Sequence, residues 1–231
     1  MKDQKILIVG GLSGIGFAVA QQAAAAGARV TVAGRRAAPA GLPATITAMH
    51  VDIANDASVA ALFEGVGAFD HLVITAGPVI GSAKLAELDI ADAMAAFNIK
   101  FFGQMRVAQR ALDTINRAGS ITLTSGLLAR KAAPGALVKA SMNAATEIMA
   151  KTLAKELAPL RVNVVSPGMV ETGMWGDMSE ADRKAMAARV GANLPVGRVG
   201  QGGDLAQAYL MLMQNGFMTG SVIDVDGGGL L

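Results

Sequence analysis

The feature that most constrains this chain is a glycine-rich turn between a short apolar run and an alanine-rich segment. Residues 5–9 are mostly apolar and β-branched, residues 10–16 read Gly-Gly-Leu-Ser-Gly-Ile-Gly, and alanines follow from residue 18 onward. Glycine permits a tight turn, close backbone approach to a pyrophosphate and close packing of helix on strand. The amino end of the following helix offers free N–H groups to an anion.

This context decides how the turn is interpreted, because a glycine-rich string in isolation is often an ordinary loop. Between an amino-terminal strand and a helix it predicts a dinucleotide-binding site. The residues that we expect to bind the dinucleotide at this turn are Gly10, Leu12, Ser13, Gly14, Ile15 and Gly16.

The rest of the chain alternates short apolar runs with alanine-rich segments, which is the pattern of a parallel sheet covered by helices. We predict strands at residues 5–9, 29–33, 45–51, 71–75, 120–124, 162–166 and 221–225. We predict helices near residues 15–26, 56–65, 89–115, 138–157, 179–190 and 203–214. The expected architecture is a single Rossmann-type α/β domain over residues 1–231, with a doubly wound parallel sheet of about seven strands and helices on both faces.

The end of the second predicted strand indicates which dinucleotide is bound. Residues 34–36 read Gly-Arg-Arg, where NAD-binding Rossmann domains place an acidic residue for the ribose 2′-hydroxyl. Arginine removes that repulsion and can clamp a 2′-phosphate, so we expect NADP(H) held by Arg35 and Arg36, with Ser13 as a supporting hydroxyl. The alternative is that one or both arginines are solvated loop charges.

The composition limits the kinds of binding partner that we expect for this protein. The chain has no cysteine, two histidines and a net charge of +2, without a basic run. We therefore expect no metal site, no nucleic-acid or membrane partner, a small-molecule substrate and a cytoplasmic location. The uncharged stretch 6–28 is interrupted by glycine, serine and glutamine, which favours a buried strand and helix over a membrane span or signal peptide.

Motifs along nearly the whole chain make it resemble the short-chain dehydrogenase/reductase family. Gly10, Gly14 and Gly16 match the family's glycine turn, and Asn98 matches the helix asparagine of its catalytic tetrad. The resemblance implies further cofactor contacts from Asp52, Ile53, Ala76, Gly77, Pro167, Gly168 and Thr172. Residues 219–228 match the family's terminal strand.

The chain departs from the family at three of the four catalytic positions. In one gapless register Gly126 takes the serine position, Lys139 the tyrosine position and Asn143 the lysine position. The only tyrosine, Tyr209, falls in a later predicted helix.

A ketone reduced by hydride transfer needs an acid for the nascent alkoxide, which the family's tyrosine supplies with its pKa lowered by the lysine and the cofactor. We take Asn98, Ser125 and Lys139 as the candidate catalytic residues. Lys139 could donate a proton or be a surface lysine, and Ser125 could enter the pocket through a one-residue bulge or bond only to backbone.

Two functions follow. The first is an NADP(H)-dependent oxidoreductase with an atypical active site, which transfers hydride to a small apolar carbonyl, quinone or imine-like substrate. The alternative is a non-catalytic NADP(H)-binding sensor or assembly subunit.

The resemblance also implies a substrate lid over about residues 172–198 and self-association into a homodimer or homotetramer through helices 89–115 and 138–157. Met169, Met174, Trp175 and Met178 would give an apolar pocket surface, or would fill core space instead. Residues 127, 128, 134 and 137 would add to an apolar wall.

Overall fold

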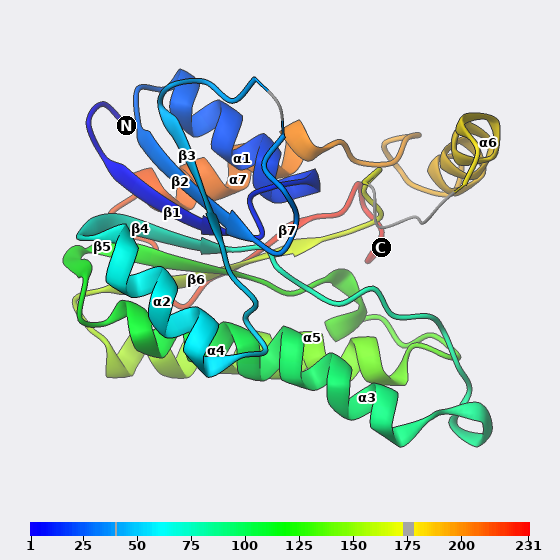
Figure 1. The fold of residues 1–231 in the computed structure, drawn as a ribbon. Helices are drawn as coiled ribbons and strands as arrows, with labels where there is room; N and C mark the ends of the chain where they lie inside the picture. The colour runs from blue at the N-terminus through cyan, green and yellow to red at the C-terminus, as the bar shows by residue number, and fades with distance from the viewer. Residues whose placement is uncertain (40, 173–177) are drawn as a thin grey trace.

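The computed structural model describes residues 1–39, 41–172 and 178–231, and its centre is a parallel sheet of seven strands (Figure 1). The predicted strands and the single-domain α/β architecture are confirmed. The strands run in the order β3-β2-β1-β4-β5-β6-β7. Their bounds are Lys5–Val9 for β1, Arg29–Gly34 for β2, Ile46–His50 for β3, Phe69–Ile74 for β4, Ile115–Thr124 for β5, Arg161–Pro167 for β6 and Val222–Val225 for β7.

The strand order reverses beside β1. This strand pairs with β2 on one edge and with β4 on the other, all in parallel register. Helices after β1 and β4 must then leave the sheet in opposite directions, which opens a crevice at the carboxyl ends of these strands. The glycine-rich turn begins at this point, directly after Val9.

Helices cover both faces of the sheet (Figure 1). Helices α1 (Gly14–Ala25) and α7 (Gly202–Gln214) pack together on one face, while α2 (Asp56–Val66), α4 (Gly103–Ala111) and α5 (Leu137–Glu156) cover the other. Because strand side chains alternate, Ile6 and Ile8 join the core under α1 and α7, whereas Leu7 and Val9 join the core under α2, α4 and α5. A strand buried on both faces explains why β1 is apolar without alternation.

The helix predicted near residues 89–115 is present, but it contains a π turn and ends earlier than predicted. The structure has α3 (Ile90–Phe97), then a π-helical turn η2 (Asn98–Phe102), and then α4, which ends at Ala111. Strand β5 begins at Ile115, five residues before the predicted start at Ser120. A π turn holds an extra residue, so it changes which side chains face the sheet.

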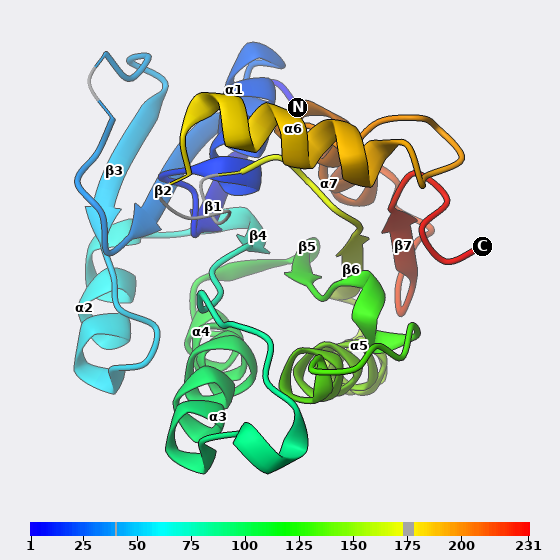
Figure 2. The same cartoon turned by 90° about the vertical axis from the view of Figure 1, so that its right-hand side faces the viewer.

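One helix lies away from both layers. Helix α6 (Glu180–Gly191) begins at the cap Ser179, whose hydroxyl accepts a hydrogen bond from the backbone N–H of Asp182 at 3.1 Å. Figure 2 looks onto the edge where the strands end, and α6 crosses above it. Two short 3-10 turns, η1 (Leu85–Glu87) and η3 (Leu127–Ala129), lie in the loops that follow β4 and β5. Among the described helices, none is both long and apolar enough to cross a bilayer.

Candidate active site

The glycine-rich turn is packed so closely that side chains are excluded at two positions. Gly10 has a φ of +93°, and a Cβ there would overlap the backbone nitrogen of Ala76 and lie 2.6 Å from Oγ1 of Thr75. A Cβ on Gly16 would overlap the carbonyl oxygen of Gly10. The turn therefore brings the start of α1 directly against the carboxyl ends of β1 and β4, which is the cradle that a pyrophosphate requires.

The amino end of α1 faces the crevice. Ser13 is the N-cap residue in extended conformation, and within the described chain its side chain makes no capping hydrogen bond. Ser13 and Gly14 are exposed, while Leu12 is buried behind them and Ile15 is half-buried. The open side of Gly14 looks toward Thr172, because a Cβ on Gly14 would lie 3.5 Å from Cβ of Thr172. The turn and the segment after β6 thus border one space.

The predicted 2′-phosphate site lies at the end of β2. Arg35 and Arg36 are exposed and follow Gly34, the last residue of the strand. A Cβ on Gly34 would come 3.2 Å from Cδ1 of Leu12, so β2 ends against the glycine-rich turn. The backbone that carries Arg35 and Arg36 therefore lies next to the pyrophosphate cradle.

Asp52 and Ile53 follow β3 on the same edge of the sheet. The carboxylate of Asp52 accepts a 3.0 Å hydrogen bond from the backbone N–H of Ala54, and the Asp52 N–H donates to the hydroxyl of Ser58 at 2.9 Å. Ile53 is buried against α4, where a Cβ on Gly103 would come 2.8 Å from its Cδ1. These contacts fix the loop on which the resemblance places the adenine.

The ends of β4, β5 and β6 complete the crevice. Ala76 and Gly77 follow β4, Ser125 follows β5, and Pro167 and Gly168 close β6. A Cβ on Gly168 would lie 2.6 Å from the Cα of Asp226, so the terminal strand region packs directly on this turn.

A polar network ties these strand ends to α5. The hydroxyl of Ser125 donates to Oε1 of Glu147 at 3.0 Å, and Glu147 forms an ion pair with Arg130 at 3.4 Å. Arg130 also donates to the hydroxyl of Ser166 at 3.0 Å and forms an ion pair with Asp224. Ser125 is therefore buried with its hydroxyl committed to a carboxylate. Glu147 and Arg130 were not predicted from the sequence, because their partners lie far along the chain.

The three positions that the sequence register assigns to the family's serine, tyrosine and lysine lie just after β5 and in the first two turns of α5. A Cβ on Gly126 would lie 2.8 Å from Nδ2 of Asn143, so the side chain of Asn143 occupies space beside the glycine. Lys139 donates to the hydroxyl of Ser82 at 3.4 Å, in the loop after β4.

Asn98 and Tyr209 each form a hydrogen bond with another side chain. Oδ1 of Asn98 accepts a 3.3 Å hydrogen bond from Arg106, so its side chain is bonded within its own helical segment. Tyr209 is buried in α7 with its hydroxyl 2.6 Å from Oγ1 of Thr124, and burial raises the pKa of its phenol. Tyr209 supports the packing of α7 on β5. Its phenol is bonded to Thr124 inside the core and is therefore not exposed to a substrate.

Parts of the predicted lid fall outside the described residues, namely Met174 and Trp175. Met169 and Met178 are half-buried on either side of that segment. Leu127, Leu128 and Pro134 lie in the loop after β5, and Leu137 at the start of α5 is exposed.

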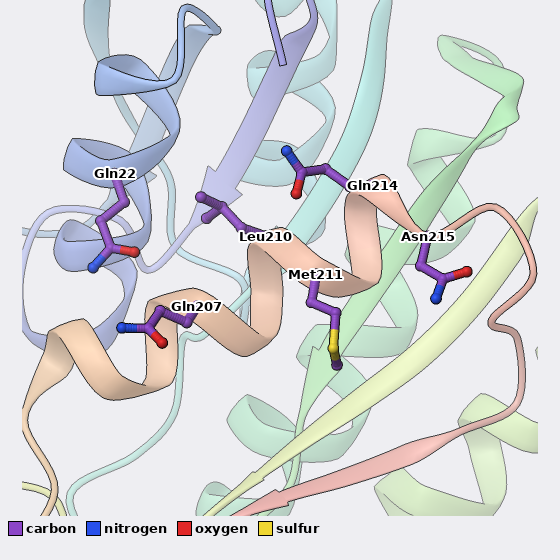
Figure 3. A pocket seen from close by; sticks show the side chains of 6 residues that line it. All are labelled: Gln22, Gln207, Leu210, Met211, Gln214 and Asn215. Atoms are coloured by element: carbon purple, nitrogen blue, oxygen red, sulfur yellow. The ribbon is translucent and has the colours of Figure 1, made fainter.

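A hollow of about 440 Å³ lies elsewhere, between α1 and α7 (Figure 3). It is lined by Gln22, Gln207, Leu210, Met211, Gln214 and Asn215. Gln22 lies in the carboxyl-terminal half of α1 and the other residues lie between the middle of α7 and its C-cap, whereas the glycine-rich turn lies at the amino end of α1. The hollow has only amide and apolar side chains and offers no charged group for a phosphate.

The fold and the cradle define a dinucleotide-binding protein of the doubly wound α/β class. The sequence profile of a family described as enoyl-(acyl carrier protein) reductase matches residues 10–229. The chain belongs to the short-chain dehydrogenase/reductase family, as two curated relatives also show.

One relative is the short-chain dehydrogenase/reductase ATR9 of Stachybotrys chlorohalonatus, which is 38% identical over 100% of this chain and 98% of its own length. Another is the 3-oxoacyl-[acyl-carrier-protein] reductase of Bos taurus, which is 31% identical over 98% of each chain. A solved structure of a small-chain dehydrogenase in complex with NADPH has a TM-score of 0.87 and 40% identity, and the match covers 99% of each chain. The family resemblance drawn from the motifs is confirmed, and with it the prediction of an oxidoreductase.

Proposed function

We propose that this protein is an NADP(H)-dependent oxidoreductase with an atypical active site that reduces a small apolar carbonyl, quinone or imine-like substrate. The observation that carries the cofactor assignment is the pair Arg35 and Arg36 beside the pyrophosphate cradle, where an NAD-binding domain has an acidic residue. NADPH in the solved relative at 40% identity supports the same cofactor.

The residues present fit this group. The side chains excluded at Gly10 and Gly16 leave backbone N–H groups of the turn and of α1 for the pyrophosphate. Arg35 and Arg36 would hold the 2′-phosphate, while Asp52 and Ile53 would border the adenine. Ala76, Gly77, Pro167, Gly168 and Thr172 would border the nicotinamide half. When bound, NADPH supplies a hydride at its nicotinamide ring.

The substrate would lie above the ends of β4, β5 and β6, under the segment 172–198 acting as a lid. Leu127, Leu128 and Pro134 on one side and Met169 and Met178 on the other supply apolar surface. This lining favours an apolar or planar guest. We also propose a cytoplasmic location and a homodimer or homotetramer, with one candidate active site in each copy.

The test is NADPH oxidation measured by nicotinamide absorbance over a panel of small ketones, quinones and cyclic imines, with NADH in parallel. We expect turnover of at least one class, with a kcat/KM for NADPH at least about 10-fold above that for NADH, because the 2′-phosphate adds charge-assisted hydrogen bonds. Tight binding of NADPH and NADP⁺ without turnover of any class would replace this proposal by a non-catalytic NADP(H)-binding sensor or assembly subunit.

A further inference from the structure

Lys100 is a buried lysine on the π-helical turn η2, and none of the sequence motifs drew attention to it. Only 9% of the residue is exposed. Its ammonium group donates a long hydrogen bond of 3.5 Å to the carbonyl oxygen of Ser125, at the end of β5. The same nitrogen lies 3.8 Å from the point that a Cβ on Gly77 would occupy, at the end of β4. The side chain of Lys100 therefore extends from the helical layer that contains α4 to the ends of β4 and β5, which border the candidate active site.

The π turn explains how a lysine gets there. In the segment 98–102, Phe102 is exposed while Lys100 is buried, which is the reverse of what their polarity predicts. Gln104 stabilises this arrangement from one turn later. Its amide Nε2 donates to the carbonyl of Lys100 at 2.7 Å, and its Oε1 accepts from the N–H of Thr124 at 3.2 Å. The turn is thus fixed to β5 by a fully buried side chain.

Several charged side chains of the neighbouring elements bond to residues other than Lys100. On α5, Glu147 bonds to Ser125 and Arg130, and Lys139 bonds to Ser82. On α4, Arg106 pairs with Asp56. Among the described residues, Lys100 takes part in no ion pair, and burial alone lowers its pKa to about 8. A buried ammonium with one long hydrogen bond is costly for folding, so its retention points to a use other than stability.

We propose that Lys100 is the proton donor of the active site and takes the part that a tyrosine phenol plays elsewhere in the family. This inference rests on the proposed function. As the carbonyl carbon of the substrate accepts hydride, the π electron pair of its C=O bond moves onto oxygen. An N–H bond of the Lys100 ammonium breaks, the proton joins that oxygen, and the electron pair stays on Nζ as a neutral amine. The amine then takes a proton from water, so the substrate is reduced to an alcohol and NADPH is the species oxidised.

Geometry favours Lys100 over the two donors expected from sequence. The hydroxyl of Ser125 donates to Glu147, and the ammonium of Lys139 donates to the hydroxyl of Ser82. Gly77 places no side chain beside the Lys100 ammonium, whose hydrogen bond goes to the backbone carbonyl of Ser125.

A first test needs no substrate. NADP⁺ has a cationic ring and NADPH a neutral one, so an ammonium near the ring loses part of its proton only when NADP⁺ binds. Calorimetry at pH 8 in buffers of different ionisation enthalpy measures the protons released by each cofactor. We expect NADP⁺ binding to release about 0.3 to 0.5 of a proton more than NADPH binding, since a group with a pKa near 8 is half protonated there.

Variants identify the residue that releases this proton. In Lys100→Met the difference between the two cofactors should vanish, and in Lys100→Arg it should vanish while a cation is kept, because arginine does not titrate in this range. Lys5→Met, at the opposite end of β1, should keep the wild-type difference. An unchanged difference in Lys100→Met or Lys100→Arg, or its loss in Lys139→Met, would overturn the proposal. Absence of binding heat with both cofactors would instead overturn the proposed function.

Turnover gives the second readout. With a ketone from the panel, Lys100→Met should lower kcat about 10²- to 10⁴-fold while the Kd of NADPH changes less than about 3-fold. The wild-type kcat/KM for reduction should fall above pH about 8 as Lys100 loses its proton. A kcat that survives in Lys100→Met and collapses in Lys139→Met would identify Lys139 as the donor.

Discussion

At the residue scale, Arg35 carries the expected cofactor preference. It lies exposed beside the glycine-rich turn, so its guanidinium can reach a 2′-phosphate without breaking any packing. Arg35→Ala should raise the Kd of NADPH about 10-fold or more, because a hydrogen bond to a charged group contributes about 1.5 to 3 kcal/mol. The Kd of NADH should change less than about 3-fold.

Calorimetric titrations of both cofactors check this prediction, and Arg36→Ala measured beside it shows which guanidinium does more. Equal losses of NADPH and NADH affinity in Arg35→Ala would mean that the side chain supports the loop and does not bind the phosphate.

Gly10 tests the packing of the cradle. Alanine there would have to adopt a φ of +93° and would overlap the backbone of Ala76. We expect Gly10→Ala to lower the free energy of unfolding by about 2 to 4 kcal/mol, as strain and overpacking add, and to weaken binding of NADPH. Urea denaturation and calorimetry measure the two effects.

Gly67→Ala is the matched control for Gly10→Ala. Gly67 has a φ of +65° at the end of α2, with nothing within 4 Å of a built Cβ. Its φ of +65° and ψ of −168° lie in a region that is nearly restricted to glycine, so Gly67→Ala should lose about 1 to 3 kcal/mol through backbone strain alone. It should bind NADPH normally. If both variants lose the same stability, the close approach of Gly10 to β4 is not a constraint on the fold.

At the scale of elements, the pairing of β4 with β5 should make stability depend on pH. His71 of β4 is buried, and its Nδ1 lies 2.9 Å from the hydroxyl of Ser120 on β5. Within the described structure Nε2 has no hydrogen-bond partner. Burial lowers the pKa of His71 to about 4; the charge of Asp70 opposes this shift and that of Arg161 adds to it.

Stability should fall as the pH is lowered. Well above pH 6.5 His71 is neutral in both the folded and the unfolded chain, so it makes no pH-dependent contribution there. Between pH 6.5 and about 4 the imidazole of His71 is protonated in the unfolded chain but stays neutral in the folded chain. The free energy of unfolding therefore falls by up to about 3 kcal/mol as the pH is lowered. Urea denaturation from pH 7.5 to 4 should show this loss in the wild type. His71→Gln should show less of it, and His50→Gln, at an exposed position, should match the wild type. Parallel pH profiles for wild type and His71→Gln would contradict the assignment.

The elements differ in how well they could be predicted from the sequence. Strands such as β1 and β6 are buried on both faces, so their apolar runs marked them directly. The first half of β5 reads Ile-Asn-Arg-Ala-Gly and is largely exposed, so no apolar pattern announced it. The π turn is invisible in the sequence, and a lysine in an otherwise amphipathic helix is ordinarily a solvated residue. Lys100 was missed for that reason.

The cofactor cradle was predictable because its residues are contiguous. Gly10 to Gly16 act through backbone conformation, which a short motif encodes. The network of Ser125, Glu147 and Arg130 joins residues brought together only by the folded sheet. No local pattern in the sequence reports such a contact.

At the scale of the whole molecule, the face formed by α4 and α5 carries exposed apolar side chains. Phe102 at the start of α4 is 49% exposed, and Ile148 in the middle of α5 is 62% exposed. We expect light scattering to report a dimer or tetramer, and Ile148→Glu to shift it toward monomer because a charge buried in an apolar contact is costly. Far-ultraviolet circular dichroism checks that the variant is folded. A wild-type protein that stays monomeric at high concentration would contradict this prediction and show that these side chains form no interface.

The close approach of position 126 to Asn143 limits how this site can be engineered. A serine at position 126 would crowd the amide of Asn143, while a lysine at position 143 would arrive without its tyrosine at position 139. We therefore expect Gly126→Ser and Asn143→Lys to impair the site when each is made alone. A return to the family pattern would require positions 126, 139 and 143 to change together.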